Sequence, residues 1–150
     1  MDVRIERASD ADGPSILQLL QGAGLPVDGL VEHLNTAFVA RDGAAIVGCA
    51  ALETYADGAL LRSVTVAPAA RGRGVGQRLT QAAVTLAQSV GMPAVYLLTT
   101  SAESYFPKFG FVPTTKEQVP ASVKQSIEFR SACPASAIVM CKTLNDSAEE

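Results

Sequence analysis

Hydrophobic and polar positions along the chain follow two periods, one of strands and one of helices. Alternation and short apolar runs predict strands at VRIERA (3–8), three in succession within 37–67, AVYLLTT (94–100), FVPTTK (111–116) and SAIVMCKTL (136–144). Apolar residues at helical spacing predict helices over residues 9–24, 27–35, about 76–90 and 101–110, with one helical segment in 117–134.

Turn and cap residues divide these elements. Asp42-Gly43 and Asp57-Gly58 split residues 37–67 into three strands that should pair antiparallel. Ser9 or Asp10 can cap the first helix, and Gly91 followed by Pro93 ends the helix over 76–90. The strand, loop, helix and strand within 60–99 should form a parallel crossover.

The element order predicts a mixed α+β fold, with a central sheet of about seven strands flanked by helices. The 150 residues suit one domain, 1–150, whose polar end at 145–150 is expected to fray. Hydrophobic residues make up 48% and charged residues 18%, which is a globular composition.

Charge and composition exclude several classes of function. A net charge of -3 argues against nucleic-acid binding, which needs a basic surface. No apolar run approaches the ~20 residues of a membrane span, and no signal peptide is visible, so we expect a soluble, cytoplasmic protein. Three cysteines without a CxxC pair and one histidine argue against a metal site.

The stretch VAPAARGRGVGQRL (66–79) carries the strongest functional signal. Glycines between a strand and a helix let the backbone approach a ligand, and the helix start presents free N–H groups to an anion. The Walker pattern is absent, and the spacing of Gly72, Gly74 and Gly76 fits the Rossmann fingerprint poorly. The alternative is a helix start that merely uses glycine.

With its flanks, this stretch resembles the GNAT superfamily of acetyl-CoA-dependent N-acetyltransferases. The family's R/Q-x-x-G-x-G/A pattern appears as Arg71-Gly72-Arg73-Gly74-Val75-Gly76, and ESYFPKFGF (103–111) resembles the helix before the family's Gly-Phe pair. The resemblance covers about residues 3–144 and implies acetyl-CoA as co-substrate. Backbone N–H groups from Arg71 to Gln77 would hold its pyrophosphate. Val64 and Val66 would line its pantetheine arm, on a strand splayed from the next.

Two stretches of the chain resemble particular subfamilies more closely. VYLLTTSAESYFPKFGFVP (95–113) resembles the acetyltransferase domain of N-acetylglutamate synthases. The segment 119–140 resembles acetyltransferases of arsenic-resistance operons, through Pro120, Ser126, Glu128, Phe129, Cys133, Pro134, Ser136 and Met140. These resemblances imply a small amine acceptor, an amino acid or an analogue that can contain arsenic, acetylated by direct transfer.

Several residues are candidates for the catalytic roles. Phe106 occupies the position where many family members carry a tyrosine acid, so Tyr105 is the candidate proton donor, with Thr99, Thr100, Ser104 or a water as alternatives. Glu53 is the leading candidate base, or else a solvated strand-end glutamate. Glu103 and Glu128 are lesser candidates.

Substrate contacts are proposed for Arg62 and Thr99. An arginine in ALLRSVTV (59–66) would share a strand face with Val64 and Val66 and could clamp a carboxylate; the alternative is an internal salt bridge, for instance to Glu53. Arg130 is a second carboxylate candidate. The cysteines could bind trivalent arsenic or be small buried side chains.

Other features of the sequence concern the packing of single residues, the oligomeric state and a second class of function. His33 is expected on the surface of a helix, and Tyr55 and Tyr96 in the core or at its rim. The apolar strand SAIVMCKTL is compatible with a homodimer, by analogy with the family. A non-catalytic module that binds acetyl-CoA is the second class of function, favoured by Phe106.

Overall fold

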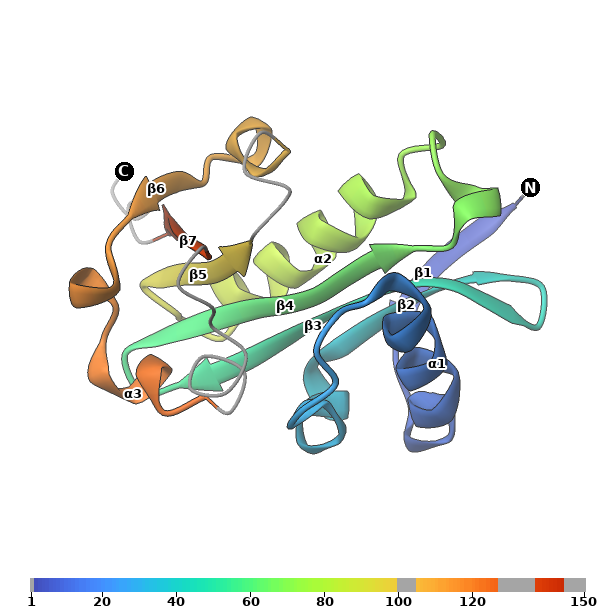
Figure 1. Ribbon diagram of the computed structural model, residues 1–150, viewed down its shortest axis with the longest axis horizontal. Coiled ribbons are helices and arrows are strands. Elements are labelled where there is room, and N and C mark those ends of the chain that lie inside the picture. Colours follow the sequence, from blue (N-terminus) through green and yellow to red (C-terminus); the bar gives the residue numbers. More distant parts are fainter. Residues whose placement is uncertain (1, 100–104, 127–136, 145–150) are drawn as a thin grey trace.

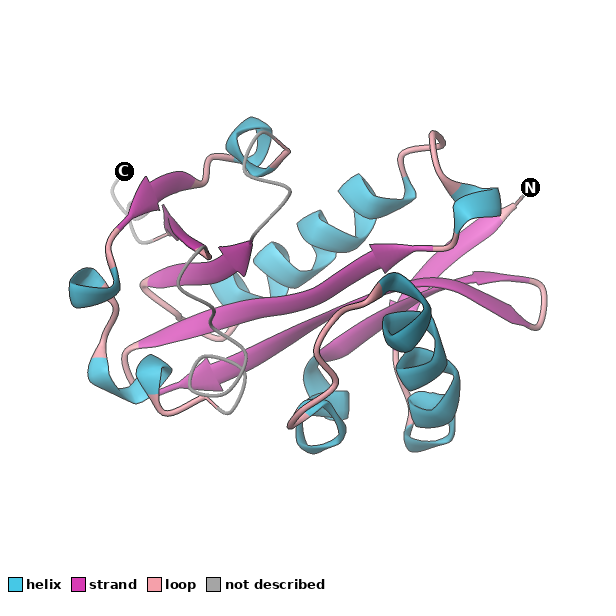
Figure 2. Ribbon diagram, viewed as in Figure 1, coloured by secondary structure: helices cyan, strands magenta, loops and turns pink. Residues whose placement is uncertain are grey.

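The computed structural model describes residues 2–99, 105–126 and 137–144, which form one mixed sheet with helices on both faces (Figures 1 and 2). Within these residues the sheet has seven strands in the order β1-β2-β3-β4-β5-β7-β6. The strands are β1 Val3–Arg7, β2 Ala37–Asp42, β3 Ala45–Tyr55, β4 Gly58–Val66, β5 Ala94–Thr99, β6 Val112–Thr114 and β7 Ile138–Thr143. The predicted fold class is confirmed.

Three α-helices and five short 3-10 helices connect the described strands. They are α1 Gly13–Ala23, α2 Val75–Ser89, α3 Ala121–Lys124, η1 Asp10–Asp12, η2 Leu30–Thr36, η3 Pro68–Ala70, η4 Phe106–Phe109 and η5 Lys116–Gln118. None of these helices has the length and apolar character that a membrane span requires.

The meander β2-β3-β4 is antiparallel as predicted, and its two connections are the Asp-Gly turns. After β4 the chain runs through α2 and returns as β5, which pairs parallel to β4. The parallel part of the predicted crossover is therefore confirmed. Strand β7 lies between β5 and β6, so burial inside the sheet accounts for its apolar composition.

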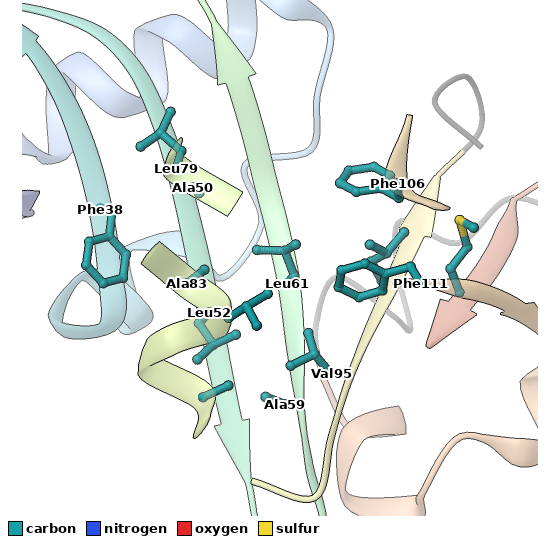
Figure 3. Packing of buried hydrophobic residues seen from close by; sticks show 14 of the residues in the cluster. Phe38, Ala50, Leu52, Ala59, Leu61, Leu79, Ala83, Val95, Phe106 and Phe111 are labelled. Atoms are coloured by element: carbon teal, nitrogen blue, oxygen red, sulfur yellow. The ribbon is translucent and has the colours of Figure 1, made fainter. Parts of the chain in front are cut away.

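The larger core lies between the sheet and α2 (Figure 3). Leu79 and Ala83, one turn apart on α2, pack with Leu52 and Leu61 from the two central strands. Phe106 and Phe111 close the same cluster beside β5, with ring centroids 5.9 Å apart. Helix α2 begins directly after the glycine loop, so this core fixes the loop against the end of β4.

The opposite face carries two smaller clusters. Ile16 and Leu20 of α1 pack with Val39 and Cys49 under the strands β2 and β3. A separate cluster joins Leu60 to α3 and β7. The gap between these clusters along the central strands is where the polar network described below lies.

A β-bulge at Ser63 changes which side of the sheet β4 presents. Ala51 pairs with Arg62, but Cys49 pairs with Thr65, so β4 carries one residue more than β3 in this interval. Ser63 has a positive φ of 62°, uncommon for a residue with a side chain. One extra residue reverses the alternation of side chains.

The shared face predicted for Arg62, Val64 and Val66 is therefore wrong. Both valines pack against the α2 core, as Leu61 does, whereas Arg62 points to the face covered by α1 and η2. The cause is the extra residue at Ser63, for which the sequence has no signal.

A polar cluster of side chains links the first elements of the chain to β2. Asp12 accepts hydrogen bonds from the Ser9 backbone N–H at 2.8 Å and from Nη2 of Arg41 at 2.7 Å. Arg41 also donates to Glu6 of β1. The Ser9 N–H and the Arg41 guanidinium hold the pKa of Asp12 below its ordinary 3.8, although burial opposes this shift.

Replacing Asp12 with asparagine should lower the free energy of unfolding by about 1–3 kcal/mol at pH 7, because Arg41 and Ser9 lose a charged acceptor. A carboxyl group whose pKa is depressed by folding stabilises the fold above its unfolded pKa. The difference between the two proteins should therefore vanish as the pH falls through the folded-state pKa of Asp12. Urea unfolding at a series of pH values measures this; a difference that stays constant into acid would contradict it.

Candidate functional site

Strands β4 and β5 separate at one end, and this splay organises the site. They share only the pairs Ala59 with Val95 and Leu60 with Tyr96. Beyond that rung, β4 continues to Val66 next to β3 alone, and β5 continues to Thr99 next to β7 alone (Figure 1). The facing edges of the two strands therefore do not pair with each other across the splay, and an extended ligand can bind between such edges.

The glycine loop follows directly from the open end of β4. Gly72 and Gly74 have φ values of 80° and 76°, a region that disfavours other residues. Gly74 is the N-cap of α2, and the first turn of α2 offers N–H groups without helical partners. Nε of Arg71 donates to the Val66 carbonyl at 3.0 Å and anchors the loop to the strand. The sequence-predicted anion site thus has the backbone shape it needs.

A cationic groove of about 590 Å³ runs beside this loop, and we use that name for the space lined by Arg73, Gly74, Gln77, Arg78, Gln81, Lys108 and Phe109. Three lining residues are cations and none is acidic, on a chain whose net charge is -3. Arg78 also donates to the Val3 carbonyl at 3.0 Å. The groove attracts anions to the start of α2.

Sequence reasoning identified only the loop side of this groove. Arg78 and Gln81 lie on α2 one turn and two turns beyond Gly74, so the helical period was the signal for them. Lys108 comes from η4, far along the chain. No sequence pattern links it to α2.

Tyr105 and Phe106 are adjacent in the chain, but their side chains point in different directions. Phe106 is buried in the α2 core. The Tyr105 hydroxyl lies 3.0 Å from the position of a Cβ on Gly76, next to Val66. Burial raises the pKa of Tyr105, and the neighbouring Thr80 hydroxyl opposes this shift. The Thr80 hydroxyl itself makes no regular hydrogen bond to a described residue. Tyr105 therefore keeps its proton at neutral pH, at the junction of the loop and the splay.

Glu53 and Arg62 form a buried ion pair on the other face of the sheet. Nη1 of Arg62 donates to Oε2 of Glu53 at 3.0 Å, and these side chains are 0% and 1% exposed. Arg62 also donates to the carbonyls of Pro26 and Asp28 and to Oγ of Ser63. The salt bridge considered for Arg62 has formed, so a carboxylate clamp would require Glu53 to give up this partner.

Glu53 has two further neighbours. The Tyr55 hydroxyl donates to Oε1 of Glu53. Burial, followed by the hydrogen bond to Glu53, raises the pKa of Tyr55 to about 12. Nε2 of His33 lies 3.7 Å from Oε2 of Glu53. We refer to Glu53, Arg62, Tyr55 and His33 as the acid network.

His33 is the residue of this network that the sequence analysis missed. It was expected on a helix surface, but its side chain is only 23% exposed and lies edge-on to Tyr55, with ring centroids 6.4 Å apart. A lone histidine in the segment VDGLVEHLN gives no signal of contact with a glutamate twenty residues away.

The remaining candidates divide by location. Thr99 ends β5, three residues beyond the last pair with β4. Thr100, Glu103, Ser104, Glu128 and Arg130 lie outside the described residues, as does Cys133. Cys49 is buried and donates to the Ser63 carbonyl at 3.2 Å; burial raises its pKa to about 12. Burial also raises the pKa of Cys141, so neither thiol favours the metal-binding thiolate. In the described chain no three His, Cys, Asp or Glu side chains are grouped to hold a metal ion.

Known proteins share both the sequence and the fold of this chain. Residues 33–113 match the model of the acetyltransferase (GNAT) domain. An N-acetyltransferase of Chlorobaculum tepidum is 30% identical over 151 residues, which cover 95% of this chain and 96% of that protein. An amino-acid acetyltransferase of Ralstonia nicotianae is 38% identical over 88 residues, 57% of this chain. The match spans only 19% of that protein's length.

Two solved structures match nearly the whole chain. N-acetylglutamate synthase of Neisseria gonorrhoeae, in complex with coenzyme A and N-acetylglutamate, has a TM-score of 0.81 and 24% identity, with 97% of this chain and 36% of that one covered. A Mycobacterium tuberculosis protein in complex with coenzyme A has a TM-score of 0.80 and 24% identity, with 94% and 99% covered. With the splay, the glycine loop and the family match together, the chain belongs to the GNAT family of acetyl-CoA-dependent N-acetyltransferases.

Proposed function

We propose that the chain transfers the acetyl group of acetyl-CoA to the amine of an amino acid or an amino-acid analogue. One observation carries this proposal: the splay lies between the cationic groove on one side and the acid network on the other. An anionic coenzyme can therefore approach from the groove, while an amine approaches the face that carries the acid network.

The coenzyme would bind through the loop and the open strand. Backbone N–H groups from Arg71 to Gln77 would hold the pyrophosphate, and the three cations of the groove would attract its phosphates. The pantetheine arm would run along Val64 and Val66, whose side chains are partly buried against α2. The Val66 N–H would then polarise the acetyl carbonyl.

The chemistry needs no acyl-enzyme. The acceptor ammonium loses one proton, its nitrogen attacks the carbonyl carbon, and the C–S bond breaks as the C–N bond forms. The nitrogen loses a second proton, and the departing thiolate gains one, for which Tyr105 is the proposed donor. The overall products are the acetylated amine, free coenzyme A and one proton.

An amino acid is the proposed acceptor because several curated relatives are named amino-acid acetyltransferases. An N-acetylglutamate synthase with the same fold was solved with N-acetylglutamate. Arg62 and Thr99 remain the candidates for acceptor contacts. Arsenic-containing amino acids belong among the acceptors to be tested because of the sequence resemblance of segment 119–140.

Thiol release from acetyl-CoA, measured against a panel of amino acids and analogues that begins with L-glutamate, tests this function. Release that depends on one class of amine supports it. Binding of acetyl-CoA without release for any amine would favour a non-catalytic binding module, the alternative that Phe106 at the usual tyrosine position keeps open. A homodimer remains a separate prediction for the oligomeric state in solution.

Gly76→Val should weaken acetyl-CoA binding about tenfold or more. A Cβ there lies 3.0 Å from the Tyr105 hydroxyl and 3.5 Å from Cγ2 of Val66, so the two γ-carbons of valine would fill the junction of loop and splay. Gly22→Val on α1 is the matched control, since a Cβ at Gly22 meets nothing within 4 Å. Calorimetric titration with acetyl-CoA measures both; equal affinities in the two variants would place the coenzyme elsewhere.

A further inference from the structure

Within the acid network, His33 is the base that is not held by buried hydrogen-bond partners among the described residues. Oε2 of Glu53 accepts from Arg62 and Oε1 accepts from Tyr55, inside a region that solvent does not reach. Glu53, whose side chain is 1% exposed, is therefore buried out of direct reach of the acceptor, whereas His33 beside it is 23% exposed and is the neighbouring group that can carry a proton.

The position of the network relative to the splay is fixed by strand register. Glu53 pairs with Leu60, and Leu60 pairs with Tyr96 at the last rung before β4 and β5 separate. Arg62 lies two residues further along β4, already beyond that rung. The ion pair, and His33 against it, thus lie beside the base of the splay.

The backbone of η2 holds His33 in this place. The Thr36 hydroxyl lies 3.2 Å from the His33 carbonyl and also contacts the carbonyl of Leu52, the residue before Glu53. His33 itself has φ -119° and ψ 20°, a break in the helical geometry of η2. The segment is therefore fastened to β3 directly beside the carboxylate that the imidazole faces.

We propose that His33 accepts the proton of the acceptor ammonium and that Glu53 positions it. With Nε2 toward Glu53, the neutral imidazole carries its proton on Nε2, and Nδ1 keeps the lone pair that takes the proton from the acceptor. The imidazolium that forms is stabilised by the Glu53 carboxylate and releases its proton to water through its exposed edge. This inference rests on the proposed function and assigns one of its proton transfers.

The groups around the imidazole come from several elements. Glu53 and Tyr55 of β3 face it, and Arg62 of β4 stands behind Glu53. Pro26 and Asp28, in the loop before η2, direct their carbonyls at Arg62. Glu32, the residue before His33, is exposed. In the described chain, the Glu53 carboxylate is the charged group that lies against the imidazole, 3.7 Å from Nε2.

The pH profile of kcat/KM in His33→Gln tests the assignment. A general base contributes about 10²–10⁴-fold, so we expect a loss of about 10²-fold at pH 7. The loss should shrink as the pH rises toward the pKa of the acceptor ammonium, because the amine then deprotonates without help. Glu32→Gln, which removes a charge from the same segment, should keep the wild-type profile. A profile of His33→Gln parallel to the wild type at every pH would overturn the proposal.

A second measurement is independent of turnover. The chain has one histidine, so its imidazole signals in a ¹⁵N NMR spectrum need no assignment. The neutral imidazole should carry its proton on Nε2, and saturation with coenzyme A and the best acceptor of the panel should shift its signals. A proton on Nδ1, or signals that the acceptor leaves unchanged, would overturn the proposal.

The two tests separate this inference from the proposed function. If wild-type protein releases thiol with an amino acid and His33→Gln behaves the same, the transferase function stands and the role of His33 is wrong. If wild-type protein releases no thiol with any amine, the proposed function itself is wrong.

Discussion

Arg62→Ala should lower the free energy of unfolding by about 3–5 kcal/mol, the range for removing one partner of a buried ion pair. The substitution leaves the Glu53 carboxylate buried without its cation and takes donors from the carbonyls of Pro26 and Asp28. Urea unfolding followed by circular dichroism measures the change. A smaller effect is expected when Glu53→Leu and Arg62→Met are combined, because no uncompensated charge remains.

Arg4→Ala provides the matched control for this experiment. Arg4 and Glu6 form an ion pair at 3.8 Å whose side chains are 63% and 39% exposed. Exposed pairs contribute about 0–1 kcal/mol, so this variant should unfold almost as the wild type does. If Arg62→Ala and Arg4→Ala have equal stabilities, the ion pair between β3 and β4 does not stabilise the fold.

Tyr105→Phe should lower kcat by about 10²-fold and leave the KM for acetyl-CoA nearly unchanged, because the proton transfer proposed for the hydroxyl occurs only when the thiolate departs. Its position 3.0 Å from a Cβ on Gly76 places it where the coenzyme is proposed to pass. Burial raises the pKa of Tyr105 above its ordinary 10.0, so the donor stays protonated until the solution is strongly alkaline. Fixed-time assays of thiol release at saturating substrate concentrations measure kcat.

Tyr96→Phe is the control for the loss of a phenol. Burial also raises the pKa of Tyr96, but its ring packs with Leu60 and the α3 cluster on the opposite face from α2. This variant should retain most of the wild-type kcat. An unchanged kcat in Tyr105→Phe would mean that the thiolate takes its proton from water.

Local signals in the sequence were sufficient for the architecture. The Asp-Gly pairs at 42–43 and 57–58, and the glycine at 91, lie where the chain turns or α2 ends, because each satisfies a local backbone requirement. The glycine loop was also predictable from the sequence, because a positive φ at Gly72 and Gly74 restricts the residue type directly.

The features that escaped prediction depend on contacts between distant residues. The fold brings His33 to Glu53 only because η2 is fastened to β3 through Thr36, and no spacing in the sequence encodes that contact. Lys108 reaches the groove from η4 for the same reason. The bulge at Ser63 needs no glycine, so an ordinary strand pattern concealed it.

The bulge at Ser63 changes which face of the sheet the even-numbered residues of β4 occupy. Before Ser63, the even-numbered residues of β4 face the acid network; after it, the even-numbered residues face α2 and the coenzyme side. Deleting Ser63 would place Val64 directly after Arg62, and regular alternation would still direct Val64 toward α2. A regular strand that kept Ser63 would instead place Val64 on the face of Arg62. The orientation of Val64 and Val66 toward α2 therefore depends on the extra residue standing outside the regular alternation of this strand. Loss of the bulge at unchanged length would exchange the two faces beyond Ser63, whereas deletion of the extra residue would preserve them.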